Sequence, residues 1–382
     1  MKLTKYKLGD LIRQRRQKND SDDLPICGVT RDGFIPPKQQ DADTSLYNVF
    51  YLKDFVFNPA RMELNAIVFN DCYEKAICSS LYEVFYVHRP EVILPEYLAL
   101  LVKQDWFTRY CEFMGSGSAR EYCRVANISE LEIEVPPIEF QAEMARDNQI
   151  IRDRIELKRR INDNLEATAQ AVFQDQFASY YGCDELPEGY SIVSLDSLCT
   201  VKGGKRLPAD CELLDNPTEH PYIRVRDVGG SRYVCLTDQF QYIDEGTHQA
   251  ISRYIVNTGD IVISIVGTIG LLGKIHSSLD NANLTENCVK LAGIHTVTSD
   301  YLYYTLCYKK QIKEIDLLTV GAVQAKLPMY NIQSMKILVP PTNVISDFQK
   351  KMDALDEQIE ANTVEIQKLN ELRSVLLAKL SD

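Results

Sequence analysis

The chain has 382 residues, of which 45% are hydrophobic and 25% are charged, a composition that excludes wholesale disorder and fibrous proteins. Its length predicts two or three domains. The longest uncharged apolar stretch, Ile261 to Gly273, spans thirteen residues, whereas a membrane helix needs about 20. The N-terminus also lacks the apolar core of a signal peptide. We therefore expect a cytoplasmic protein that uses no membrane.

Cysteine and histidine spacing argues against a disulfide framework and against a metal site. The eleven cysteines form no CxxC pair, and the five histidines form no HxH or HExxH pattern. We expect reduced, mostly buried thiols and no cofactor. The net charge of −12, taken alone, disfavours a nucleic-acid partner, because phosphate contacts need lysine and arginine. However, seven of the first 18 residues are basic and only one is acidic, so the chain can still offer local basic faces.

The first half of the chain reads as short strands followed by helices. Residues 55–57 (Phe-Val-Phe) predict a strand that ends at Asn58-Pro59, and residues 97–113 predict an amphipathic helix. After Pro136-Pro137 we expect a long helix from about residue 141 to 177, because the residue before a proline is rarely helical. Apolar positions in it recur in steps of three and four, as in a heptad seam. The seam positions are Ile151, Ile155, Lys158, Asn162, Leu165, Ala169 and Val172, of which Lys158 and Asn162 are polar interruptions.

The second half repeats this order. Gly259-Asp260 is a turn signal before Ile261–Val266, a β-branched run that predicts a buried strand. Residues 301–315 predict an amphipathic helix, and a second seam follows Pro340-Pro341. Its positions are Met352, Leu355, Ile359, Asn362, Ile366, Leu369, Arg373, Leu376 and Leu380. Each half is therefore expected to be an α+β domain with a helical segment after it.

Direct sequence matches indicate an internal duplication. A shift of 204 places residues 95–98 (PEYL) on 299–302 (SDYL), Asn127-Ile128 on Asn331-Ile332, and the Val-Pro-Pro at 135–137 on that at 339–341. A shift of 206 places residues 54–58 on 260–264, and a shift of 196 places 25–29 on 221–225. Three blocks in the same order are hard to attribute to chance.

The two long helices are expected to pair with each other. A single amphipathic helix of about 37 residues, on the order of 55 Å, needs a partner for its apolar stripe. If the second helix ran parallel to the first, it would point away from both domains and have no helix to pack on. The pair should therefore be antiparallel. The domains would then be related by a pseudo-twofold axis at the two ends of a rod. The alternative is that each helix packs only on its own domain.

Catalytic motifs are missing. Gly267, Gly270 and Gly273 are spaced GxxGxxG, which is not the dinucleotide fingerprint, and Gly203-Gly204-Lys205 lacks the rest of a P-loop. The run at 58–61 (Asn-Pro-Ala-Arg) lacks the second proline and the aromatic residue of the adenine methyltransferase motif. No nucleophile–base arrangement stands out, so the sequence predicts no enzyme.

The ordered set of motifs resembles the specificity (S) subunit of type I restriction–modification systems. The resemblance rests on the duplication, the Asn-Ile…Val-Pro-Pro junctions, residues 221–228 (Pro-Tyr-Ile-Arg-Val-Arg-Asp-Val), residues 259–270 (Gly-Asp-Ile-Val-Ile-Ser…Gly-Thr-Ile-Gly) and the loop at Gly321. It implies two pseudo-symmetric target recognition domains separated by an antiparallel coiled coil of two conserved helices. The corresponding boundaries here are 1–137, 138–181, 182–341 and 342–382.

The resemblance also implies partners. Family members bind double-stranded DNA, two methyltransferase (M) subunits and, in the full complex, two motor-nuclease (R) subunits. They recognise a bipartite, asymmetric target and direct adenine methylation and restriction by those partners, with no catalysis of their own. Three alternatives stay open: a self-sufficient methyltransferase, a structural adaptor whose end domains bind proteins, and the recognition subunit of a related type II system.

Candidate DNA-binding residues come from both copies. In the first we expect Asn58, Arg61, Ser116, Ser118 and Arg120, the last three in a Gly/Ser loop where backbone can approach phosphate. In the second we expect basic and polar side chains near glycines and near the junction: Lys202, Lys205, Arg206, Arg224, Arg226, Thr268, Gln324 and Lys326. Arg120 and Gln324 align, and both suit base-edge contacts. For each residue the competing interpretation is a solvated surface group.

Overall fold

A computed structural model describes residues 3–21, 23–37, 43–115, 122–181, 183, 185–237, 239–321 and 325–380, apart from the side chain of Lys310. The chain forms two compact units. The first comprises residues 1–158 and 364–382, and the second comprises residues 159–363. Each unit therefore contains one copy of the duplicated domain together with part of both long helices.

The first unit contains two four-stranded sheets and a strand pair. One sheet is antiparallel, in the order β2 (Ile12–Arg15), β9 (Glu83–Val87), β6 (Phe55–Phe57), β7 (Ile67–Phe69). The other has the order β4 (Phe34–Ile35), β3 (Ile26–Val29), β8 (Lys75–Cys78), β5 (Asn48–Tyr51). The separate pair is β1 (Thr4–Lys7) with β10 (Glu132–Val135). Within the second sheet, β3 and β8 run parallel.

The second unit contains the corresponding sheets. Its larger sheet has the order β12 (Thr200–Gly203), β19 (Cys288–Ala292), β16 (Ile261–Ser264), β17 (Leu272–Ile275), β14 (Tyr233–Val234). The smaller has the order β15 (Gln241–Tyr242), β13 (Pro221–Ile223), β18 (Asn283–Leu284). The separate pair is β11 (Ser191–Ser194) with β20 (Lys336–Val339).

Strand registers confirm the duplication. Thr4 pairs with Val135 in the first copy, and Ser191 pairs with Val339 in the second. The parallel pair β3–β8 corresponds to the parallel pair β13–β18, and the central strand β6 corresponds to β16. Strands β6 and β16 are fully buried. The β-branched run predicted burial for β16, whereas at β6 the sequence predicted only a strand. The strand in the second copy is shorter than expected and ends at Ser264, after which Val266 forms an isolated bridge to Lys326.

Each of the two predicted amphipathic helices is a helix pair. The first copy has α1 (Pro95–Leu101) and α2 (Asp105–Gly115) in place of one helix over 97–113, and the second has α6 (Ser299–Cys307) and α7 (Lys309–Leu318) in place of one over 301–315. Tyr308 ends α6 because its backbone is extended, with φ −69° and ψ 137°. The shorter helices are α3 (Val125–Ser129), α5 (Glu245–Ala250) and α8 (Met329–Ser334).

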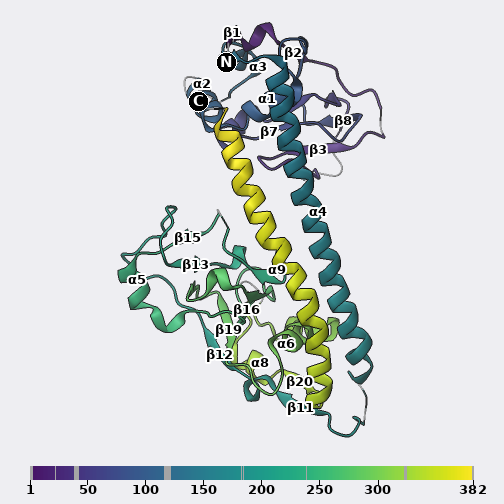
Figure 1. The fold of residues 1–382 in the computed structure, drawn as a ribbon, viewed down its shortest axis with the longest axis vertical. Helices are drawn as coiled ribbons and strands as arrows, with labels where there is room; N and C mark the ends of the chain where they lie inside the picture. The colour runs from purple at the N-terminus through teal and green to yellow at the C-terminus, as the bar shows by residue number, and fades with distance from the viewer. Residues whose placement is uncertain are drawn as a thin grey trace. The chain divides into compact units, whose positions relative to one another are not determined.

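The long helices are α4 (Ile138–Phe177) and α9 (Thr342–Ala378), the teal and yellow helices of Figure 1. In the first unit Arg373 Nε donates to Asn148 Oδ1 at 2.9 Å, and the Lys158 ammonium lies 2.8 Å from the Glu365 carboxylate. In the second unit Asn362 Nδ2 donates to Asn162 Oδ1 at 2.7 Å. Residue numbers rise along α4 as they fall along α9, so the pairing is antiparallel. Every predicted seam position is buried or half-buried.

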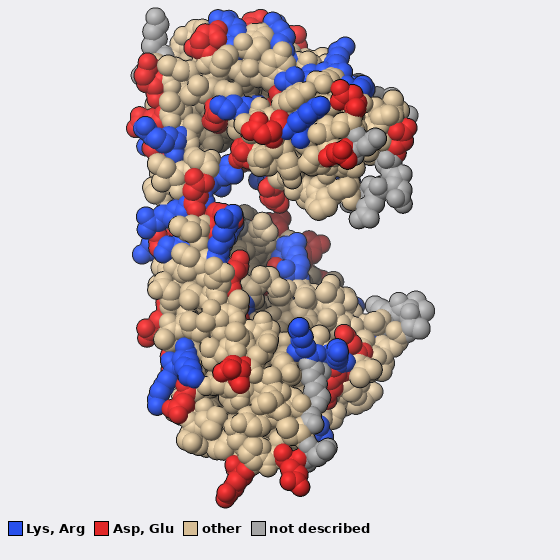
Figure 2. Space-filling view, turned by 90° about the vertical axis from the view of Figure 1, so that its right-hand side faces the viewer, with Lys and Arg blue, Asp and Glu red and all other residues tan. Residues whose placement is uncertain are grey.

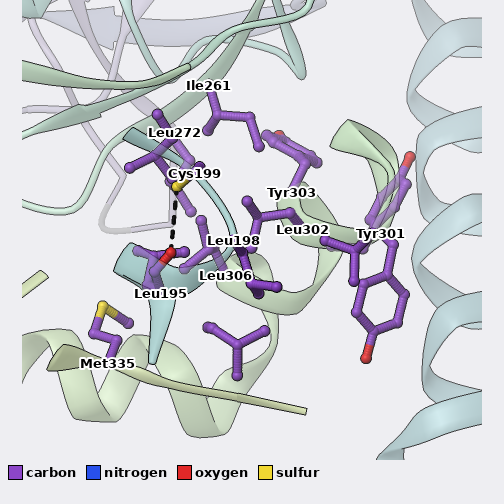
Figure 3. Packing of buried hydrophobic residues seen from close by; sticks show 14 of the residues in the cluster. Leu195, Leu198, Cys199, Ile261, Leu272, Tyr301, Leu302, Tyr303, Leu306 and Met335 are labelled. Atoms are coloured by element: carbon purple, nitrogen blue, oxygen red, sulfur yellow. Dashed lines mark hydrogen bonds between the residues drawn. The ribbon is translucent and has the colours of Figure 1, made fainter. Parts of the chain in front are cut away.

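Each unit shares one core between its domain and its helix segments. In the second unit Phe173 and Phe177 of α4 and Phe348 of α9 pack on Tyr301, with ring centroids 5.0–6.1 Å apart. Figure 3 shows Leu302 and Leu306 of α6 packed in the same core, where Cys199 Sγ donates to Leu195 O at 3.5 Å. Burial of each such side chain contributes about 1.5–3 kcal/mol. The seam helices are thus part of the domain cores.

All eleven cysteines are free thiols, and six of them are buried. Within the described ranges no three histidine, cysteine, aspartate or glutamate side chains are grouped so that they could hold a metal ion. No helix in the described part of the chain is both long enough and apolar enough to cross a bilayer.

Candidate nucleic-acid interface

Basic residues of the second domain meet at one edge of the β13–β18 pair. Because these strands are parallel, their carboxyl ends lie at the same edge, where Arg224 follows β13 and Thr285 follows β18. Thr285 N donates to Ile223 O at 3.0 Å, and Lys205 N donates to Leu284 O at 2.8 Å. The segment that leaves β12 is therefore held against the same edge, and three predicted residues, Lys205, Arg206 and Arg224, are brought together there.

Gly204 makes this approach possible. A Cβ atom at this position would lie 2.0 Å from Thr285 O and 2.4 Å from Leu284 O, so no other residue fits without a backbone shift. On either side of the glycine pair, the ammonium groups of Lys202 and Lys205 lie 5.5 Å and 5.8 Å from the ring centroid of Tyr254. Tyr254 was not among the predicted residues, because it lies far along the chain from the two lysines.

The three arginines at this edge have different roles. Arg206 is 81% exposed and lies 2.7 Å from the Glu286 carboxylate, which raises the pKa of Arg206 by hydrogen bonding. Arg224 is largely buried; its guanidinium lies 3.1 Å from Asp227 and also donates to Gln241. Arg226 is 61% exposed and donates to Gln239 O at 3.2 Å. Arg224 thus holds the turn in place, while Arg226 keeps its charge at the surface.

Thr268 and Lys326 lie beside the same edge. Leu327 N donates to Ile265 O at 3.0 Å, so the segment before the second junction packs against the residues that follow β16. Ile265 N in turn donates to Asn287 O at 2.8 Å, which joins this pair of segments to the turn after β18. Both Thr268 and Lys326 are exposed. The segments that carry Lys205, Arg206, Arg224, Thr268 and Lys326 therefore meet near residues 284–288. Lys202 instead lies opposite Lys290 on β19, Arg226 contacts Gln239, and Gln324 lies outside the described residues.

The first domain repeats this arrangement in part. Cys123 N donates to Pro59 O at 3.0 Å, the counterpart of the Leu327–Ile265 bond. Asn58 caps the 3-10 helix Pro59–Leu64, where its Oδ1 accepts from Ala60 N at 3.1 Å, so this side chain has a structural role. Arg61 is exposed. The predicted residues Ser116, Ser118 and Arg120 lie outside the described part of the chain.

A buried ionic cluster, which the sequence did not predict, fixes the second domain to its helices. The Arg232 guanidinium, 2% exposed, pairs with Asp300 of α6 and with Asp356 of α9. Lys274 of β17 lies 2.5 Å from the same Asp300 carboxylate. Burial alone would lower the pKa of Arg232, but Tyr304 and the two carboxylates raise it, so the charge is retained. These four residues are far apart in sequence, and nothing in the sequence pairs them.

Charges of both signs mix over the surface. Figure 2 shows blue and red side chains interspersed, with wide uncharged areas between them. Beside the ionic cluster, a cavity of about 440 Å³ is lined by Arg226, Arg232 and Gln239 and by Arg159 and Glu166 of α4. On the face shown no extended positive area appears, and the basic side chains just described form a local cluster, which agrees with a net charge of −12.

Comparison with known families identifies the chain. The family model described as "Type I restriction modification DNA specificity domain" matches residues 60–167 and 187–372. The chain belongs to this family. As the resemblance implied, it is a non-catalytic DNA sequence-recognition subunit that assembles with other restriction–modification subunits. The alternatives of a lone methyltransferase, a structural adaptor and a type II subunit are not favoured.

Individual relatives agree with this assignment. The MjaIX specificity subunit of Methanocaldococcus jannaschii is 23% identical over 75% of this chain and 68% of its own length. The HindI specificity subunit of Haemophilus influenzae is 20% identical over 76% and 77%. A crystal structure of the S subunit from M. genitalium covers 99% of this chain and 96% of that one, with a TM-score of 0.56 and 17% identity. The fold is therefore that of a type I specificity subunit.

Proposed function

We propose that this specificity subunit reads a split, asymmetric DNA target, with one half-site for each globular copy. The observation that carries the proposal is the repeated sheet order on an antiparallel helix pair, combined with different side chains at matching positions. Because the two copies share a fold, each can contact its half-site in a similar orientation. Because their side chains differ, each can select different bases. The readers are residues 1–137 and 182–341, and the spacer helices are residues 138–181 and 342–382.

The contact residues divide into two kinds. Lys205 and Lys326 are exposed, Lys202 is half-buried, and all three suit backbone phosphates. Arg226 is also exposed and suits a phosphate, although its guanidinium lies 3.6 Å from the Asp227 carboxylate. Thr268 follows the central strand of its domain and suits a base edge, as do Arg120 and Gln324 in the two junction loops. In the first copy Arg61 occupies the place after β6. Arg206, already paired with Glu286, contributes less net charge.

The partners are those that the resemblance to the family implies, and the duplication suits their number. Two pseudo-equivalent copies offer two equivalent positions for methyltransferase subunits, and two motor-nuclease subunits complete the restricting complex in the cytoplasm. The methyltransferase supplies the N6-methylation of adenine. It also supplies many of the contacts to the phosphates of double-stranded DNA, because the specificity subunit is acidic overall. The half-sites should be separated by a constant gap of about one DNA turn or a multiple of it.

The test is co-expression with the adjacent methyltransferase, followed by mapping of methylated adenines across the host genome. The proposal predicts one bipartite motif with two different halves and a constant gap. Methylation at a short continuous site would contradict two separate readers. Replacing Thr268 by valine should relax discrimination at a position in one half only.

A further inference from the structure

Strand registers identify which residues of the two copies occupy the same place. Arg15 of β2 pairs with Val84 of β9, and Lys202 of β12 pairs with Lys290 of β19. Because β9 and β19 pair with the equivalent strands β6 and β16, Val84 and Lys290 are equivalent, and so are Arg15 and Lys202. The same offset, 187, relates Thr4 to Ser191 in the neighbouring strand pair. Continuing it three residues, past the end of both strands, aligns Lys18 with Lys205. Beyond the strands the backbone neighbours differ, because Lys18 bridges Asn48 of β5 whereas Lys205 N donates to Leu284 O of β18.

The copies thus keep a basic residue at two equivalent positions, although their sequences differ at most others. Between the two basic positions, residues 16 and 17 of the first copy are Arg-Gln, whereas the aligned residues 203 and 204 of the second copy are Gly-Gly. Direct sequence matching found no such alignment, because the first eighteen residues share no motif with the second copy. Retention of charge at a fixed place within a diverged duplication indicates a requirement that both copies share.

The two retained positions have different environments. The Arg15 guanidinium is bound to Asp54 at 2.6 Å and lies 4.7 Å from the centroids of both Tyr51 and Tyr86, with the side chain 24% exposed. This arginine is therefore committed to the fold. Lys18 is exposed, and its ammonium donates to two neutral acceptors, Leu46 O at 2.9 Å and Asn48 Oδ1 at 2.8 Å.

These contacts orient the Lys18 ammonium without neutralising it, and among the described residues no carboxylate is paired with it. Arg16 beside it is exposed and donates to the neutral Gln14 Oε1 at 2.9 Å. At the aligned position in the second copy, Lys205 lies over the Tyr254 ring, again without a carboxylate partner in the described ranges. Each copy thus presents an uncompensated cation two or three residues after the end of equivalent strands, β2 and β12.

We propose that Lys18, together with Arg16, binds the phosphodiester backbone of the half-site read by the first copy, as Lys205 does for the second. The inference rests on the proposed function and adds a pair of equivalent phosphate contacts, one for each half-site. Such contacts position each reader on the duplex without selecting a sequence. Each neutralised phosphate releases counterions. Each contact therefore makes the slope of log binding constant against log salt concentration steeper by about 0.9.

The experiment measures the affinity of the complex with its methyltransferase for target DNA over a range of salt concentrations. K18Q and K205Q should each make the slope of log affinity against log salt concentration shallower by about 0.9. The double variant should make it shallower by about 1.8. K18R keeps the charge and should retain the original slope. K5Q is the matched control, because Lys5 is exposed but lies 3.5 Å from the Glu134 carboxylate in the β1–β10 pair; its slope should not change. The methylated motif should stay the same in all variants.

Phosphate-ethylation interference locates each contact. K18Q should lose interference on one half-site and K205Q on the other. An unchanged slope for K18Q, or loss at the same half-site for both variants, would overturn the proposed pairing. Failure of the wild-type complex to methylate a bipartite motif would instead overturn the proposed function.

Discussion

Replacing Arg232 by methionine tests the buried ionic cluster that joins the second domain to its helices. The guanidinium is 2% exposed and serves two carboxylates, Asp300 and Asp356, with the Tyr304 ring centroid 5.0 Å away. Methionine keeps much of the apolar volume but leaves the Asp356 carboxylate without a cation, while Lys274 still pairs with Asp300. Removing one partner from a buried ion pair costs about 3–5 kcal/mol.

We therefore expect R232M to lower the free energy of unfolding by about 3–5 kcal/mol, as measured by urea denaturation followed by far-UV circular dichroism. The matched control is R226Q, six residues earlier and 61% exposed, which should change that free energy by less than about 0.5 kcal/mol. A loss below about 1 kcal/mol in R232M, or equal losses in both variants, would refute the view that this cluster anchors the domain.

Three further outcomes are expected. G204A should destabilise the chain by about 1–3 kcal/mol and weaken binding to one half-site, because its Cβ would meet Thr285 O. The control is the neighbouring G203A, which should be neutral because there is open space around its Cβ. Equal denaturation midpoints for the two variants would contradict the packing. N162L should cost about 1–3 kcal/mol because it removes the oxygen that accepts from the buried Asn362 Nδ2, although Asn362 Oδ1 keeps its bond from Gln358. N162L/N362L should recover most of that loss in a double-mutant cycle. Burial raises the pKa of Glu166, so its ionised form destabilises the fold at neutral pH. E166Q should therefore be more stable than the wild type at pH 8, and the difference in stability should disappear as the pH falls towards 4.5. A difference that does not depend on pH would contradict this.

Local periodicity predicted the elements that have one dominant pattern. The β-branched run at residues 261–264 forms a buried strand, and the three–four spacing of apolar residues places every seam position at a buried or half-buried site. Pairing of the helices could be inferred because α4 and α9 carry the same stripe. Their packing into the domain cores, through Phe173, Phe177 and Phe348, could not be inferred from that spacing. The break at Tyr308 could not be inferred, because the surrounding sequence has continuous helical periodicity.

The candidate site was harder to predict because it forms where distant segments meet. Lys205 and Arg224 could be nominated from charge alone, but only the β13–β18 pairing shows that they share an edge with residues 284–288. Charge alone also failed to separate Arg224, which stabilises a turn, from Arg226, which stays exposed. The cations of the first copy were visible as a basic N-terminus, but their equivalence to the second copy depends on strand register.

The most direct test of the central claim is a domain exchange read out by methylation. Residues 182–341 would be replaced by the corresponding segment of another family member, and methylated adenines mapped after co-expression with the same methyltransferase. If each globular copy reads its own half-site, one half of the motif changes while the other half and the gap stay constant. A change in both halves, or in neither, would contradict the account.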